Sequence, residues 1–117
     1  MAVILYVEDH PPAQLLMQAI VESMTAHQLI VASTGAEAHS LAAAHSVDLY
    51  VVDLDLPDTD GIALASVLKA IHAAPVLLVS AYGESVKYES LKTLIHAYLP
   101  KPLDPTYVAE IIERTLA

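Results

Sequence analysis

The chain has no cysteine, tryptophan or phenylalanine, and lysine and arginine together number only five among its 117 residues. Without cysteine it can form neither a disulfide nor a thiolate metal site, which fits a cytoplasmic protein. The 14 aspartates and glutamates leave a net charge of −9 at pH 7. A surface of that charge repels phosphate backbones, so no direct binding to nucleic acid is expected.

Long hydrophobic runs are also absent: no apolar segment of the sequence approaches the roughly 18 residues that a membrane-spanning helix needs, so no membrane partner is expected. The N-terminus, MAVILYVEDH, lacks the basic start and the cleavage site of a signal peptide. A hydrophobic fraction of 56% and a mean hydropathy of +0.52 argue against disorder. Since no linker or repeat divides the chain, residues 1–117 are expected to form a single domain.

What the sequence does contain is a series of short apolar runs, at residues 2–7, 28–32, 48–54, 75–81 and 97–100. Short, nearly continuous runs are typical of parallel strands that are buried on both faces. Segments with helical spacing separate them. This alternation predicts an α/β fold, a doubly wound (βα)5 sandwich with a five-stranded parallel sheet of flavodoxin-like order 2-1-3-4-5.

Apolar spacing and capping residues place the helices. Leu16, Ile20 and Met24 recur four residues apart after two prolines and are expected to face the core. Thr34 and Asp60 are expected to cap the second and third helices, and Asp104 with Pro105 to open the last. The expected apolar stripes of these three helices are Ala38, Leu41 and Ala42; Leu64, Leu68 and Ile71; and Val108, Ile111, Ile112 and Thr115. A further helix over 84–94 has only Val86 and Leu91 as clear apolar anchors.

Polar residues follow most of the expected strands. In open α/β sheets, ligands bind beyond the carboxyl ends of the strands. The residues at those ends are Glu8 and Asp9 after the first strand, Asp53 and Asp55 after the third, Ser80 at the fourth and Lys101 after the fifth. The topology therefore predicts that several carboxylates, a hydroxyl and an ammonium group meet at one edge of the sheet.

Carboxylates that lie so close together repel one another unless a cation is bound. Oxygen ligands without histidine or cysteine favour a hard cation, and two or three carboxylates leave room for water and a phosphate on Mg²⁺. A lysine and a hydroxyl facing that cation could contact phosphoryl oxygens, and an aspartate between them is placed to attack phosphorus. The pattern therefore predicts a Mg²⁺-dependent site for phosphoryl transfer.

Four segments at these strand ends, YVEDH, VVDLDLPDTDG, VSA and YLPKP, resemble the receiver domains of two-component response regulators over essentially the whole chain. The resemblance implies that Asp53 is the phosphoacceptor and that Glu8, Asp9 and the backbone carbonyl of Asp55 join it in binding Mg²⁺, with the side chain of Asp55 an open question. It gives Ser80 the role of the switch hydroxyl and Lys101 that of the lysine that contacts the phosphate. Tyr98 takes the place of an aromatic switch residue, and the Lys101–Pro102 bond is expected to be cis.

The resemblance also implies a function. A sensor histidine kinase or a histidine phosphotransfer protein would supply the phosphoryl group, and the domain would signal rather than act as an enzyme, although it can catalyse its own phosphorylation and dephosphorylation. A downstream target or output domain would bind at the segment 84–94, the strand 97–100 and the last helix, and the chain could also form a homodimer. Asp58 and Asp60 are expected to serve only the turn and the helix cap.

Two alternatives remain open at this stage. One is a degenerate receiver that binds proteins without being phosphorylated; the joint presence of Asp9, Asp53, Ser80 and Lys101 argues against it. The other is a phosphatase of the haloacid-dehalogenase type, because DLDLP resembles a D-x-D motif. That motif should close the first strand of the fold, however, and here it follows the third apolar run.

Overall fold

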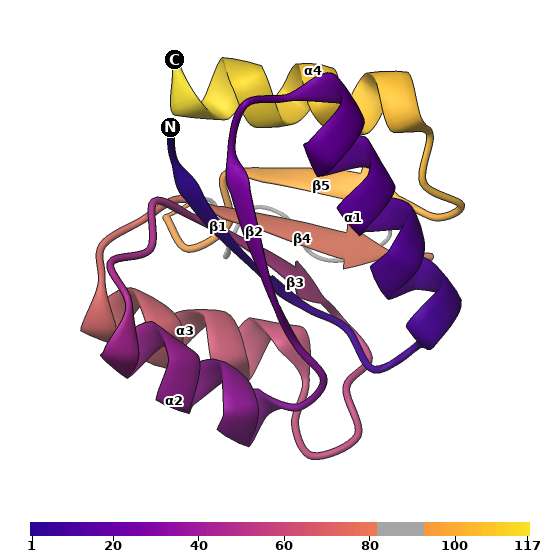
Figure 1. The fold of residues 1–117 in the computed structure, drawn as a ribbon. Coiled ribbons are helices and arrows are strands. Elements are labelled where there is room, and N and C mark those ends of the chain that lie inside the picture. The colour runs from indigo at the N-terminus through magenta and orange to yellow at the C-terminus, as the bar shows by residue number, and fades with distance from the viewer. Residues whose placement is uncertain (82–92) are drawn as a thin grey trace.

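Five parallel strands form a single sheet in the computed structural model, which describes residues 1–81 and 93–117 (Figure 1). The strands are β1 (Val3–Val7), β2 (Gln28–Ala32), β3 (Leu49–Asp53), β4 (Val76–Ser80) and β5 (Ala97–Pro100). Their order across the sheet is β2-β1-β3-β4-β5, and every neighbouring pair is parallel. The expected sheet and its strand order are thereby confirmed.

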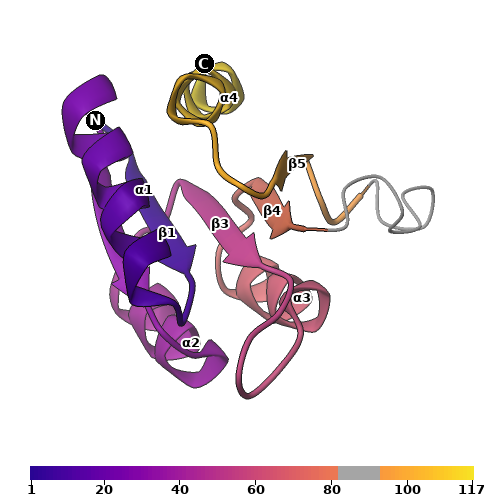
Figure 2. The same cartoon turned by 90° about the vertical axis from the view of Figure 1, so that its right-hand side faces the viewer.

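Helices cover both faces of the sheet (Figure 2). They are α1 (Pro11–Met24), α2 (Gly35–Ala44), α3 (Gly61–Ile71) and α4 (Pro105–Leu116). The α1 and α4 helices pack on one face, and α2 and α3 pack on the other. Most of the helix expected over 84–94 lies outside the described residues, which omit 82–92. Thr93 and Leu94 are described and lie in a turn. Within the described ranges, no helix is long and apolar enough to span a membrane.

Alternate residues of each central strand serve the two cores. In β1, Ile4 and Tyr6 face α1 and α4, whereas Leu5 and Val7 face α2 and α3. Every residue of β3 and β4 is buried, as the apolar runs predict. The same prediction was wrong for β2 and β5, because these strands lie at the sheet edges and remain partly exposed.

The first helix corrects another expectation. Its buried residues are Met17, Ile20 and Val21. Leu16 and Met24 are 38% and 44% exposed, so only Ile20 of the predicted stripe faces the core. The i, i+4, i+8 spacing drifts around a helix of 3.6 residues per turn, whereas an i, i+3, i+4 set stays on one face.

The capping predictions held for the later helices. Thr34 accepts a hydrogen bond from the Glu37 backbone N–H at the start of α2. Asp60 does the same for Ala63 at the start of α3, and Asp104 accepts from Thr106 at the start of α4. Each side chain thus satisfies one of the backbone donors that the first helical turn leaves without a partner.

Both ends of the chain lie at the edge of the sheet where the strands begin (Figure 1). His27, just before β2, accepts a hydrogen bond at Nδ1 from the Ala2 backbone N–H at 3.0 Å. Its Nε2 pairs with the carboxylate of Glu113 in the last turns of α4. One imidazole therefore links the start of β1 to the end of α4.

Candidate functional site

Three carboxylates gather where β1 and β3 end side by side. Val7 pairs with Val52 in the sheet, so Glu8 and Asp9 emerge next to Asp53. One carboxylate oxygen from each of these three acids lies within 4.8 Å of the others. Glu8 and Asp53 are 1% and 2% exposed, whereas Asp9 is exposed. The predicted acidic group therefore forms, with two members buried and one open to solvent.

Lys101 closes the other side of the group. It directly follows β5, and its Nζ donates to Asp53 Oδ2 at 2.9 Å and lies 3.7 Å from Glu8 Oε1. Burial works to lower the pKa of this ammonium, but the hydrogen bond and charge of Asp53, with the charges of Glu8 and Asp55, outweigh it and raise the pKa above its usual value. The Lys101–Pro102 bond is cis, as expected.

Glu8 has the most perturbed acidity of the site. Its Oε2 accepts from the His10 backbone N–H at 3.3 Å, and its Oε1 lies 3.5 Å from the buried Tyr6 hydroxyl. Burial, with the hydrogen bond and charge of Asp53, raises the Glu8 pKa to about 7, although Lys101 and His10 act in the opposite direction. Burial and the charges of Glu8 and Asp53 likewise raise the pKa of Tyr6. Glu8 thus holds a proton well above the pH at which a free glutamate loses it.

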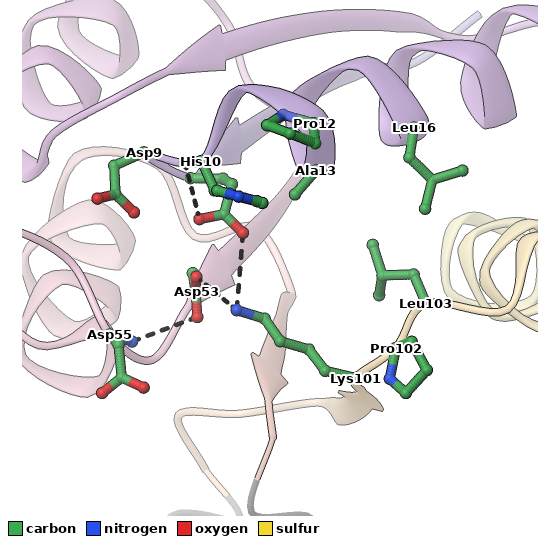
Figure 3. A pocket seen from close by; sticks show the side chains of 11 residues that line it. Asp9, His10, Pro12, Ala13, Leu16, Asp53, Asp55, Lys101, Pro102 and Leu103 are labelled. Carbon is green, nitrogen blue, oxygen red and sulfur yellow. Dashed lines mark hydrogen bonds and ion pairs between the residues drawn. The ribbon is translucent and has the colours of Figure 1, made fainter.

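The loop after Asp53 separates the remaining aspartates. The Asp55 backbone N–H donates to Asp53 Oδ1 at 3.3 Å, while its side chain is exposed and directed away from Asp53 (Figure 3). Asp55 is thus no member of the three-carboxylate group. Asp58 serves a different purpose from the three-carboxylate group. It accepts hydrogen bonds from the backbone N–H groups of Gly35 at 2.8 Å and Ala36 at 3.1 Å, at the start of α2. These bonds hold the pKa of Asp58 below its usual range.

A cavity of about 800 Å³ opens over the acidic group. One part is lined by Glu8, Asp9, Asp53, Asp55 and Lys101, and the rest by His10, Pro12, Ala13, Leu16, Pro102 and Leu103. In Figure 3, Leu16 of α1 and Leu103 of the loop after β5 face each other across the apolar part. The partial exposure of Leu16 follows from this position beside the cavity.

The comparisons with known proteins agree with this geometry. The profile described as "Response regulator receiver domain" matches residues 4–113. The chain belongs to this family. Receiver-domain relatives include the transcriptional regulatory protein KdpE of Mycobacterium tuberculosis, 35% identical over 87% of the chain and 45% of its own length. The transcriptional regulatory protein ZraR of Escherichia coli is 32% identical over 97% of the chain and 26% of its own length. The chain thus spans less than half of these curated relatives.

Solved receiver domains share the fold. A receiver domain from Methylobacillus flagellatus is 26% identical with a TM-score of 0.88, covering 98% of both chains. The chemotaxis protein CheY4 of Vibrio cholerae superimposes with a TM-score of 0.90 at 20% identity, covering 99% of both chains. The receiver domain of the sensor histidine kinase PA1611 from Pseudomonas aeruginosa, with magnesium in its active site cleft, has a TM-score of 0.86 at 24% identity and covers 98% and 97% of the two chains.

The donor set of this receiver domain fits the Mg²⁺ expected from its sequence. Glu8, Asp9 and Asp53 offer oxygen ligands only, which suits a hard cation. The exposed position of Asp9 and the open cavity leave room for water, which Mg²⁺ usually keeps in its coordination shell. A cation there would also offset the burial and the charge of Asp53, which together raise the pKa of Glu8.

Ser80 and Tyr98 lie on the neighbouring strands β4 and β5. Ser80 ends β4 and is 2% exposed, and its backbone carbonyl accepts from the Lys101 N–H at 3.2 Å. Tyr98 lies in β5, half-buried against the core that α2 and α3 cover. Burial raises the pKa of its hydroxyl. Both residues occupy the expected strand positions; their switch roles remain predictions.

Sequence reasoning missed the contacts that three polar residues make. The sequence gives Tyr6 the pattern of an ordinary core residue, because it lies within an apolar run. Its hydroxyl nevertheless lies 3.5 Å from the carboxylate of Glu8. Asp58 caps a helix that begins 23 residues earlier in the chain, which no local capping pattern reveals. Gln14 bonds to the backbone at the end of β1. The phosphatase alternative also loses its basis, because DLDLP closes β3 rather than β1.

The metal-free receiver domain should lose stability as the pH rises from about 4.5 to about 7. In this interval the unfolded chain has released the Glu8 proton, whereas the folded protein still binds it, so raising the pH favours unfolding. The expected loss is about 3 kcal/mol in the free energy of unfolding, and it levels off above the folded pKa. Urea denaturation in EDTA at a series of pH values measures it.

The Glu8→Gln variant is the control for this pH dependence, because an amide of the same shape has no proton to release. The difference in unfolding free energy between wild type and variant should change across the interval, while contributions from groups that do not interact with Glu8 cancel. A constant difference would contradict the raised pKa. Affinity for Mg²⁺ should rise over the same interval in the wild type, since the cation must displace that proton.

Proposed function

We propose that this receiver domain is a phosphoacceptor of a two-component phosphorelay and that Asp53 takes the phosphoryl group. The observation that carries the proposal is the setting of Asp53, buried at a strand end between two further carboxylates and an ammonium group 2.9 Å away. A carboxylate held in this way is aligned for attack on phosphorus, so the site needs positioning and charge neutralisation rather than acid–base chemistry.

In the proposed step, an oxygen of Asp53 forms a bond to phosphorus while the bond to the leaving group breaks. The leaving group, the imidazole of a phosphohistidine or the acetate of acetyl phosphate, departs with the electron pair. The Lys101 Nζ donates to Asp53 Oδ2 at 2.9 Å in the unphosphorylated protein. After transfer it would donate to a phosphoryl oxygen instead. Bound Mg²⁺ would supply positive charge that offsets the negative charge of the transferred group.

Glu8, Asp9 and Asp53 would hold the Mg²⁺, with the backbone carbonyl of Asp55 as a further ligand. Support comes from the three oxygen donors within 4.8 Å of one another. It comes also from the relative PA1611, whose receiver domain carries magnesium in its cleft. The exposed carboxylate of Asp55 has no part in this proposal.

The output would be a change of surface. After phosphorylation the Ser80 hydroxyl would bind a phosphoryl oxygen, and Tyr98 would turn inward and alter the face formed by β5 and α4. An output domain or downstream target would read that face. The curated relatives are transcriptional regulatory proteins more than twice as long as the matched region, which supports an output domain as the partner. A sensor histidine kinase or histidine phosphotransfer protein would be the donor.

Incubation with acetyl phosphate and Mg²⁺ should add the mass of one phosphoryl group to the protein. Intact-mass spectrometry measures the gain, and EDTA should prevent it, because the crowded carboxylates would then repel the incoming phosphate. Hydroxylamine should remove the group, since it cleaves acyl phosphates and leaves serine and threonine esters intact. An unchanged mass would favour the degenerate receiver, and a gain that resists hydroxylamine would exclude an aspartyl phosphate.

A further inference from the structure

Gln14, in the first turns of α1, connects the carboxyl ends of two strands. Its side-chain amide donates to the backbone carbonyl of Glu8, directly after β1, at 2.5 Å. The same amide nitrogen lies 3.1 Å from the Ser33 hydroxyl, directly after β2. The side chain is half-buried, in contrast to Gln18 one turn later, which is exposed. Both donors of one neutral amide are thereby directed at the site's edge of the sheet.

The carbonyl that Gln14 binds belongs to the peptide between Glu8 and Asp9. Sheet pairing ends at Val7, and beyond it the Glu8 N–H still bonds to Ala32 at 2.9 Å. The following peptide lies beyond the sheet ladder, and the Gln14 amide holds its carbonyl at 2.5 Å. Rotation of that peptide would move the Glu8 and Asp9 carboxylates relative to each other and to Asp53, and would open the group whose oxygens lie within 4.8 Å.

We propose that Gln14 is a positioning residue for Mg²⁺: it fixes the Glu8–Asp9 peptide and so holds two ligating carboxylates in register with Asp53. The inference rests on the proposed function of this site. A neutral donor suits the task, since it orients the acids without altering the charge of the group. Partners that orient metal ligands in this way typically contribute about 10–100-fold to metal affinity.

The Gln14→Met variant keeps the length of the side chain and its helix propensity but cannot donate a hydrogen bond. Calorimetric titration with MgCl₂ should show affinity reduced by about tenfold or more. The matched Gln18→Met variant makes the same exchange on the exposed side of the same helix and should bind Mg²⁺ like the wild type. Thermal melts in EDTA should give both variants midpoints similar to that of the wild type, because the loss of the Gln14 amide changes the geometry of the metal-binding acids rather than the stability of the fold.

Two further variants sharpen the test. Gln14→Asn retains the amide on a shorter arm that no longer reaches the carbonyl, so it should weaken Mg²⁺ binding as well. If the methionine variant does not fold, the asparagine variant tests the inference in its place. Ser33→Ala removes only the second acceptor and should leave the affinity close to that of the wild type. Unchanged affinity in Gln14→Met, or equal weakening in Gln18→Met, would overturn the inference. Wild-type binding of Mg²⁺ and phosphorylation are measured separately, so failure of the proposed function would appear there instead.

Discussion

Replacing Asp53 with asparagine should abolish phosphorylation by acetyl phosphate and Mg²⁺ while leaving the metal-free fold at least as stable as that of the wild type. The amide is a poor nucleophile, so no adduct should be detectable by intact-mass spectrometry. It also removes one charge from a buried group in which Glu8 and Asp53 repel each other, an effect that contributes to the raised pKa of Glu8. Urea denaturation in EDTA measures the stability.

Asp60→Asn is the matched control, since it makes the same exchange in the same loop. Asp60 accepts from the Ala63 N–H at the start of α3, and asparagine caps helices about as well as aspartate. This variant should therefore fold and become phosphorylated like the wild type. An adduct that survives Asp53→Asn would place the acceptor elsewhere, and clear destabilisation by that variant would mean that the carboxylates do not repel as described.

Replacing Gly61 with alanine should destabilise the protein by about 3 kcal/mol, at the upper end of the usual range for overpacking. A Cβ at this position would lie 2.3 Å from the Asp53 backbone oxygen and 2.9 Å from Leu54 Cα. These atoms belong to the backbone and cannot rotate away, so the start of α3 or the end of β3 must shift. The Gly61 N–H bond to the Leu54 carbonyl, at 2.8 Å, would be strained by the same movement.

Gly35→Ala offers a direct comparison, because Gly35 also opens a helix. Its Cβ would meet the Thr59 methyl at 2.7 Å and the Asp58 carboxylate at 3.3 Å, both at the ends of side chains that can turn. Its loss of stability should be clearly smaller in urea denaturation followed by circular dichroism. Gly61→Ala should in addition weaken Mg²⁺ binding, since Asp53 moves with the strand end. Equal losses in the two variants would contradict the backbone clash at Gly61.

The meeting of the site residues at one edge of the sheet could be predicted, because it depends on local patterns and on the topology of the sheet. Apolar runs locate the strands, and parallel strands bring their carboxyl ends to one edge, so Glu8, Asp53 and Lys101 had to meet. The same reasoning assigned Asp58 to the turn or a cap but could not identify the helix that it contacts. Asp58 caps α2 across a gap of 23 residues, a contact set by how the loop crosses the sheet edge.

The errors arose where the tertiary surroundings decide burial. The run at β2 has the composition of a buried central strand, although the predicted strand order already places it at an edge of the sheet, where it is partly exposed. Leu16 fits an apolar stripe, yet it lines the cavity beside the carboxylates rather than the core. Gln14 carries no motif, because its importance comes from a backbone carbonyl on another element.

The placement of the chain ends has a practical consequence for protein engineering. Both ends lie at the edge where the strands begin, and the site lies at the opposite edge, where they end (Figure 1). A fluorescent reporter or affinity tag fused to either end would leave the molecule away from Asp53 and its phosphate donor. A linker at the N-terminus should keep a residue other than proline at position 2, because the backbone N–H there bonds to the His27 imidazole that also pairs with Glu113.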